Sequence, residues 1–202
     1  LKLEKMVNIY EIFEKPMINI LAFMEMEWIE VDSKFLKSLS IKFEKKIQNL
    51  EKKVFKISKK EFNIASPKQL GEIIYNDLKI AGLKKTKKGS FATSASVLED
   101  LAFKGHEFPQ LILDWRQVSK LKNTYSDSLP EHINPTTKRV HTSFLLAATT
   151  TGRLASSDPN LQNIPIKSED GKDIRKAFAA KNNHLLISAD YNQIEMRILA
   201  DL

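Results

Sequence analysis

An aspartate follows an apolar run near the end of the sequence. Residues 185–189 (LLISA) predict a strand, and Asp190 comes directly after it. A side chain one residue past a strand emerges at the edge of a sheet, where a carboxylate can hold a hard cation. The backbone carbonyl of Tyr191 would be a second oxygen ligand. Aspartates at strand ends are also common without any ligand, so both interpretations stay open at this point.

The residues after Asp190 predict a helix. Asn192 can serve as its N-cap and Glu195 as the capping-box residue. This structural explanation accounts for Asn192 and Glu195 and leaves Asp190 unexplained. The buried face of the helix would consist of Ile194, Ile198 and Leu202.

A second polar group lies in residues 149–165, TTTGRLASSDPNLQNIP. Arginine and amide side chains can donate to base-edge acceptors, which lie in nearly equivalent places for A·T and T·A pairs in the minor groove. Such donors would contact a duplex without reading its sequence. The alternative is a polar loop whose amides satisfy its own backbone. The candidate donors are Arg153, Asn160, Gln162 and Asn163.

The positive charge of the chain is concentrated in residues 34–60. This window holds ten lysines and two glutamates, whereas the whole chain has a net charge of +7. A basic stripe can neutralise phosphates and release counterions. It can equally be the solvated face of a helix, and charge alone does not decide between the two.

The sequence pattern is helical up to about residue 125, so helices are expected to carry and orient much of the chain. Apolar residues at steps of three and four from Phe35 to Ile57 predict one long helix. Ser66, followed by Pro67 and Gln69, predicts a helix start, and Gly82 its end. Further helical patterns cover residues 3–27, interrupted at Pro16, and residues 94–104 and 109–125, after a basic loop at 84–90.

The pattern changes near residues 126–135. Strands are predicted at 139–144 and 185–189, with a short extended piece at 174–179. Turn-forming residues occupy 149–153 and 157–160. A helical half therefore precedes an α+β half.

Composition excludes several classes of protein. No apolar run reaches about 18 residues and no secretory signal opens the chain, so neither a membrane span nor secretion is predicted. The absence of cysteine excludes disulfides, thiolate zinc sites and cysteine nucleophiles, and fits a reducing cytoplasm. The four histidines have no metal-ligand spacing. The first residue is leucine, which indicates a piece of a longer protein.

Several long motifs resemble family A DNA polymerases, and in particular bacterial DNA polymerase I. Residues 188–202, SADYNQIEMRILADL, resemble motif A of this family, and residues 151–165, TGRLASSDPNLQNIP, resemble the segment that precedes it. Five other stretches fit the same family in the same order. They are EFNIASPKQLGEIIYNDL, KKTKKGSFAT, LILDWRQVSKLKNTYSDSLP, RVHTSF and EDGKDIRKAF.

The resemblance implies roles for the terminal residues. Asp190 would be the first catalytic carboxylate, which binds both Mg²⁺ ions, with the Tyr191 carbonyl as a further ligand. In a two-metal mechanism one ion activates the primer 3′-hydroxyl and the other steadies the triphosphate. Glu195 would lie against the incoming sugar and exclude a 2′-hydroxyl by its bulk. Gln193 would contribute to the nucleotide site, and Arg197 would support the motif.

The resemblance also implies DNA contacts. Arg153 would reach the minor groove at the primer end, with duplex contacts from Asn160, Gln162 and Asn163 nearby. The helical half would grip duplex phosphates, and the lysine-rich helix would be a thumb helix with a solvated face. The expected contacts there are Lys84, Lys85, Lys87, Asn123 and Thr124.

The sequence departs from the family pattern in two places. Leu145 and Leu146 replace a polar residue followed by glutamine, which puts a polar contact there in doubt. Lys167 replaces an arginine beside the triphosphate, so it keeps the charge and loses the bidentate fork.

The resemblance implies an α+β fold. Residues 1–130 would be a mostly helical thumb, with 1–30 a candidate connection from an upstream exonuclease-like domain. Residues 131–202 would be the first part of an antiparallel-sheet palm with motif A, and the fingers and the rest of the palm would be absent. A second catalytic aspartate would be absent too, so this piece alone would be inactive.

The expected function is therefore that of part of a DNA-directed DNA polymerase in replication and repair. It would extend a primer with dNTPs, using Mg²⁺, as a monomer in the bacterial cytoplasm, with primer-template DNA as its partner. The main alternative is a non-catalytic module that binds duplex nucleic acid and has no use for Asp190. A hydrolase with Asp190 as nucleophile is a weaker alternative, because no positioned base or oxyanion donor accompanies it.

Overall fold

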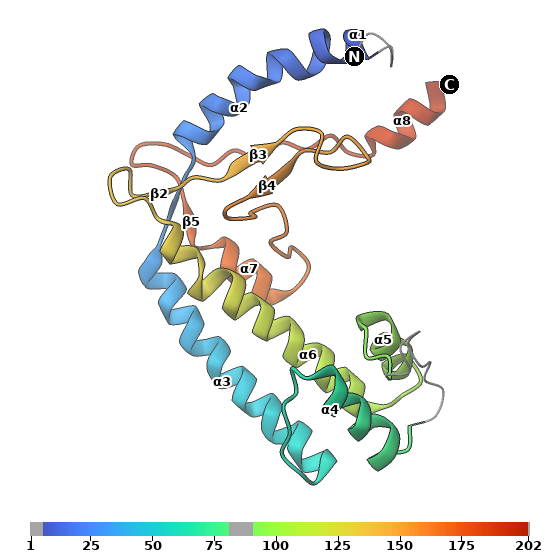
Figure 1. Ribbon diagram of the computed structural model, residues 1–202. Helices are drawn as coiled ribbons and strands as arrows, with labels where there is room; N and C mark the ends of the chain where they lie inside the picture. The colour runs from blue at the N-terminus through green and yellow to red at the C-terminus, as the bar shows by residue number, and fades with distance from the viewer. Residues whose placement is uncertain (1–5, 81–90, 202) are drawn as a thin grey trace.

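The computed structural model of the protein describes residues 6–80 and 91–201. The fold is α+β, mostly helical with small antiparallel sheets, as the sequence predicts. One long helix, residues 15–27, lies on one side of the sheet strands, and two long helices, residues 33–58 and 107–121, lie on the other side (Figure 1). The α-helices are α1 (Val7–Ile9), α2 (Lys15–Glu27), α3 (Ser33–Ser58), α4 (Pro67–Glu72), α5 (Ala95–Phe103), α6 (Glu107–Leu121), α7 (Glu169–Arg175) and α8 (Ile194–Asp201). The strands are β1 (Ile29–Val31), β2 (Arg139–Val140), β3 (Ser143–Leu145), β4 (Ala155–Ser157) and β5 (Phe178–Ala179).

The first helical segment passes through Pro16 instead of stopping there. A π-helical turn, Tyr10–Glu14, joins α1 to α2, and Lys15 N–H bonds the Tyr10 carbonyl. Proline lacks an N–H, and its ring crowds the carbonyl four residues back in a regular α-helix. The wider π-turn directly before Pro16 changes that spacing, so the helix continues to Glu27.

Helix α3 separates an apolar face from a lysine-rich face. Asp32 caps its N-terminus by accepting a hydrogen bond from the Phe35 backbone N–H at 2.9 Å. The predicted apolar stripe is confirmed, since it packs into the interior. Leu39, Phe43 and Val54 of this stripe are deeply buried, and so is Leu36, which lies next to it.

Two clusters of buried side chains form the interior along α3. The first lies between α3, the end of α6, the sheet and α7, and includes Phe43, Tyr125 and Ile174. The second lies at the other end of α3, against α4, α5 and the start of α6. The predicted helix start at Ser66 is confirmed, because its hydroxyl accepts a hydrogen bond from the Gln69 N–H. The predicted end of that helix at Gly82 lies outside the described residues.

Strand β1 forms the centre of a three-stranded antiparallel sheet with the order β2-β1-β5. Ile29 pairs with Val140, and Val31 pairs with Phe178. The sequence patterns predicted no strand between α2 and α3. This pairing joins the start of α3 to segments more than a hundred residues later in the chain.

The strand predicted at 139–144 is divided into β2 and β3. Strand β3 pairs antiparallel with β4 in a separate two-stranded sheet. The division falls at His141 and Thr142, whose side chains bond elsewhere. The His141 Nδ1 contacts the Glu25 carbonyl at 2.7 Å, and the Thr142 hydroxyl bonds the Pro159 carbonyl at 2.6 Å. These contacts turn the chain from one sheet into the other.

The extended piece predicted at 174–179 is wrong over its first half. Residues Glu169–Arg175 form α7, and only Phe178–Ala179 pair as β5. Ser168 caps α7 by accepting the Gly171 N–H at 3.2 Å, and two acidic residues occupy its first turn. Both features stabilise a helix N-terminus.

The strand predicted at 185–189 is also wrong, because these residues form no strand and pair with no other described segment. Leu185 and Ile187 are 89% and 90% exposed. The N-cap predicted at Asn192 is displaced, since α8 begins at Ile194 after Gln193, which has a φ of 53°. The predicted buried face of α8 is exposed at Ile194 and Ile198, and Leu202 lies outside the described residues.

Within residues 6–80 and 91–201, no helix combines the length and apolarity that crossing a membrane requires.

The depth of the α3 packing predicts the effect of truncating it. Phe43→Ala should destabilise α3 by about 3–5 kcal/mol, because Phe43 is fully buried and the change leaves a cavity. Native-state hydrogen exchange of the α3 amides measures this loss. Ile41→Ala on the same helix is the matched control and should change the same free energy by less than about 0.5 kcal/mol, because Ile41 is 55% exposed. Equal effects of the two substitutions would contradict this packing.

Candidate functional site

The segment 153–163 contains the end of the β3–β4 connection, strand β4 and the loop after it, and it is held by buried side chains. Leu161 and Ile164 pack against the first core cluster. Arg153 is exposed, and its carbonyl accepts a hydrogen bond from the Thr149 hydroxyl at 2.8 Å. Gly152 precedes it with a φ of 73°, a conformation that glycine adopts without strain. The backbone of this segment is therefore anchored while Arg153 is left in solvent.

The side-chain oxygen of Asn160 is hydrogen-bonded within its own loop. Its Oδ1 accepts the Gln162 N–H at 3.1 Å and a weaker contact from the Ser156 hydroxyl at 3.4 Å. Ser156 is 4% exposed and also accepts the Leu161 N–H at 3.2 Å. The amide oxygen of Asn160 thus satisfies its own loop, as the structural alternative expected. The side chains of Gln162 and Asn163 are exposed.

Asn123 and Thr124 lie in the π-helical turn Lys122–Asp127 that follows α6. Both are exposed, while the next residue, Tyr125, is buried at 2% exposure. Thr124 lines a cavity of about 220 Å³ together with Asn160 and Leu161. The fold therefore brings together two candidate DNA contacts that are 36 positions apart in the sequence.

Lys167 shares a cavity with two basic side chains that the sequence patterns did not single out. It lines a cavity of about 740 Å³ with Arg116 and Lys120 of α6. Glu99 and Asp114 line the same cavity, so the positive charge is not uniform. Burial lowers the pKa of Arg116, whose Nη1 donates to the Thr93 carbonyl at 2.7 Å. The arginine remains charged near neutral pH.

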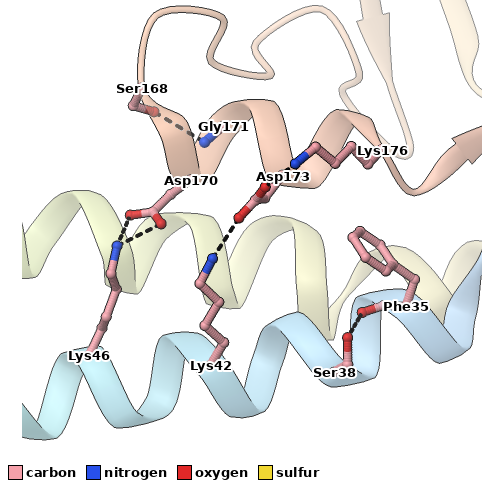
Figure 2. Close-up of polar contacts among 9 residues, drawn as sticks. All are labelled: Phe35, Ser38, Lys42, Lys46, Ser168, Asp170, Gly171, Asp173 and Lys176. Carbon is pink, nitrogen blue, oxygen red and sulfur yellow. Dashed lines mark hydrogen bonds and ion pairs between the residues drawn. The ribbon is translucent and has the colours of Figure 1, made fainter.

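Part of the lysine-rich stretch is paired with acids from other elements. Lys42 bonds Asp173, Lys46 bonds Asp170, and Lys60 bonds Asp77. Figure 2 shows the first two pairs between α3 and α7. Beyond this stretch, Asp127 and Glu44 raise the pKa of Lys122. The cations of α3 that meet α7 are therefore neutralised within the protein. The predicted contacts Lys84, Lys85 and Lys87 lie outside the described residues.

The motif from Asp190 to Arg197 is exposed along its whole length. In the part of the chain that the structure describes, the side chains of Asp190, Gln193 and Glu195 make no hydrogen bond or ion pair. Arg197 Nε donates to the Asn192 carbonyl at 3.2 Å, which ties the helix to the preceding turn. The candidate catalytic groups are thus presented to solvent.

The donor chemistry of Asp190 and Tyr191 suits a hard cation, but two oxygen ligands are too few. Magnesium takes near-octahedral oxygen coordination. Within the described ranges, no three acidic or histidine side chains are grouped closely enough to hold a metal ion. These residues therefore do not form a complete metal site by themselves.

Comparison with known proteins gives the family. The model of DNA polymerase family A matches residues 33–202. The chain belongs to DNA polymerase family A. It is 51% identical over 195 residues to DNA polymerase I of Rhizobium leguminosarum, covering 96% of this chain and 19% of that protein. It is 44% identical over 200 residues to the thermostable DNA polymerase I of Thermus thermophilus, covering 98% of this chain and 24% of that protein.

The fold of this family A chain also matches a solved polymerase. That structure is the polymerase domain of Pol1 from M. smegmatis in complex with DNA primer-template and dNTP. It has a TM-score of 0.85 and 37% identity, over 97% of this chain and 34% of that chain. The chain thus spans about a fifth to a quarter of the length of the curated relatives named above.

Thr142 supports the polar loop of this family A chain, and the sequence patterns missed it. It is 2% exposed, and its hydroxyl lies 3.0 Å from the Ser157 carbonyl and 2.6 Å from the Pro159 carbonyl. The only sequence signal was a threonine inside a predicted strand. Its bonding partners lie fifteen and seventeen positions later, so no local pattern could show them.

Thr142→Val should loosen the loop that carries the candidate minor-groove donors. The change keeps the side-chain shape and removes the hydroxyl, whose single proton is shared between the Ser157 and Pro159 carbonyls, at a cost of about 1–3 kcal/mol. Hydrogen exchange of residues 155–163 should become faster in the variant. Thr136→Val, at an exposed threonine, is the matched control and should leave this exchange unchanged. Unchanged exchange in Thr142→Val would contradict the supporting role.

Proposed function

We propose that this chain forms the thumb, residues 1–130, and the first part of the palm, residues 131–202, of a DNA-directed DNA polymerase. The enzyme extends a primer with dNTPs in the bacterial cytoplasm. The observation that carries this proposal is the anchored loop 153–163. Backbone groups and one amide oxygen of this loop form hydrogen bonds within it, and the side chains of Arg153, Gln162 and Asn163 are left in solvent.

These exposed donors suit the minor groove of the duplex primer-template. Its acceptors are nearly equivalent in A·T and T·A pairs, so arginine and amide donors can bind without reading sequence. Asn160 contributes its amide N–H groups, because its oxygen is used by the loop. Asn123 and Thr124 add contacts from the turn after α6. Lys84, Lys85 and Lys87 remain proposed phosphate contacts of the same duplex.

Lys167 and Lys120 provide two of the cations that line one cavity. Phosphate contacts from lysine position a nucleic acid and carry no sequence information. We assign this cavity to the phosphate backbone or triphosphate of the bound substrates. Lysine acts there as a point charge, without the paired hydrogen bonds of arginine.

Asp190 supplies one carboxylate, and Tyr191 one carbonyl, to a magnesium site whose other ligands come from outside the described residues. Magnesium, when bound, lowers the barrier by activating the primer hydroxyl and neutralising the triphosphate charge. Gln193 and Glu195 lie on the same exposed motif and form part of the nucleotide site. Arg197 holds the turn before α8 in place.

Asp190→Ala in the intact polymerase should reduce nucleotide addition by at least about 10²–10³-fold, because a group that stabilises transition-state charge is lost. Affinity for primer-template should stay within about twofold, because Asp190 donates nothing to DNA. Single-turnover extension and a binding titration measure the two effects. Asp201→Ala on α8 is the control and should retain activity. Full activity in Asp190→Ala would refute the metal-binding role of Asp190.

Glu195→Ala should increase ribonucleotide incorporation relative to deoxynucleotide by about tenfold or more, because space opens beside the sugar 2′ position. The measurement is the ratio of kcat/KM for a matched ribonucleotide and deoxynucleotide. Glu195→Gln keeps the side-chain volume and should keep the discrimination, since the exclusion is steric. Equal discrimination in the wild type and Glu195→Ala would refute this role.

A further inference from the structure

Helix α7 is fastened to α3 by two ion pairs. Lys42 Nζ lies 2.6 Å from Asp173 Oδ2, and Lys46 Nζ lies 2.7 Å from both carboxylate oxygens of Asp170 (Figure 2). The lysines are four residues apart on α3 and the aspartates three apart on α7. These spacings place each pair of like residues on one helix face. We call this set of four residues the α3–α7 clasp.

The clasp lies at the edge of a packed interface. The side chains of Asp170 and Asp173 are 13% and 19% exposed, whereas their lysines are about half exposed. Asp173 also accepts a bond from Lys176 at 2.7 Å. Hydrogen bonds from Lys176 and Lys42 lower the pKa of the Asp173 carboxyl to about 2, so it is charged throughout the neutral range.

The loop 164–168 moves with α7 because it is folded back onto this helix. Arg175 Nη2 donates to the Ile164 carbonyl at 3.2 Å. A Cβ on Gly171 would lie 2.5 Å from the Pro165 carbonyl oxygen, so glycine permits this close crossing. The cap from Ser168 completes the attachment. The position of Lys167, between Pro165 and Ser168, therefore depends on where α7 is docked.

Lys167 and Lys120 of α6 line the same cavity of about 740 Å³. Helix α6 shares the core with α3, through Val118 and Leu121 of α6 and Leu39 and Phe43 of α3. Ile174 of α7 is buried in the same core cluster, so apolar packing and the clasp together dock α7 on α3. Because α6 is packed on α3 as well, the clasp contributes to the placement of Lys167 relative to Lys120.

We propose that the α3–α7 clasp positions Lys167 in the cavity that it shares with Lys120, to bind the phosphate backbone of duplex DNA, which makes Asp170 and Asp173 positioning residues. This inference rests on the proposed polymerase function. The two aspartates do not touch DNA, and as acids they would repel it. They act by holding a cation in place.

A positioning role predicts whether substitution of the two aspartates weakens or strengthens DNA binding. Asp170→Asn with Asp173→Asn removes two negative charges and frees two lysines, which by the long-range field alone would tighten DNA binding. Positioning predicts the opposite. If α7 loses its ion pairs, Lys167 is no longer held at its place in the cavity, and a phosphate contact is lost.

The test uses the intact polymerase and a primer-template duplex, with Kd measured over a series of salt concentrations. The Asp170→Asn/Asp173→Asn variant should raise Kd about three- to tenfold at low salt. The slope of log Kd against log salt should fall by about one phosphate contact. Glu61→Gln/Glu72→Gln removes the same charge at exposed positions by α4 and is the matched control, which should bind equally or more tightly. Tighter or unchanged binding by the α7 variant would overturn the proposal.

Two further variants separate positioning from a loss of folding. In a Lys167→Ala background, the α7 substitutions should add less than about twofold to Kd, because the residue they position is gone. The charge swap Lys46→Glu/Asp170→Lys re-forms one ion pair and keeps the net charge of the wild type, so its Kd should stay within about twofold of the wild type. A full additional loss in the Lys167→Ala background, or a larger rise of Kd in the swap, would refute the proposal. If the wild-type enzyme itself bound no primer-template, the polymerase function would fail, and not the clasp alone.

Discussion

The pairing of β1 with strands on both sides is the interaction on which the rest of the arrangement depends. Backbone hydrogen bonds join residues 29–31 to 139–140 on one edge and to 178–179 on the other. Because β1 lies directly between α2 and α3, these bonds hold the start of α3 against the chain that carries residues 153–167. A three-residue strand therefore gives the helical arm and the polar loop a common origin.

Which basic side chains remain available for a ligand depends on their neighbours in the fold, and not on how densely lysines occur in the sequence. The most basic stretch of the sequence lies on α3, yet Lys42 and Lys46 are neutralised by α7. The candidate phosphate site instead combines Lys120 and Lys167, which come from segments with little net charge in the sequence. Ion pairs between partly buried groups are screened less than those in open solvent. Lys42 and Lys46 therefore serve the docking of α7.

Local signals predicted the helices well and the strands poorly. The apolar stripe of α3 and the Ser66 cap are confirmed, because both depend on residues within one or two helical turns. The strand predicted at 185–189 fails because an apolar run becomes a strand only when a partner edge is available. The extended piece predicted at 174–179 fails over its first half, because the cap at Ser168 and the acidic first turn favour α7. Strand β1 is too short for a periodic pattern.

The family and the chemical repertoire follow from residue types and their order alone: the carboxylate of Asp190, the bulk of Glu195, and the arginine and amides of residues 153–163. Which of these groups are exposed to solvent follows from the packing of the folded chain. The oxygen of Asn160 is bonded within its own loop, and Lys120 and Lys167 line one cavity. Residue types and order carry the motif, but availability depends on neighbours in space. Those neighbours come from positions far apart in the chain, so no local pattern contains them.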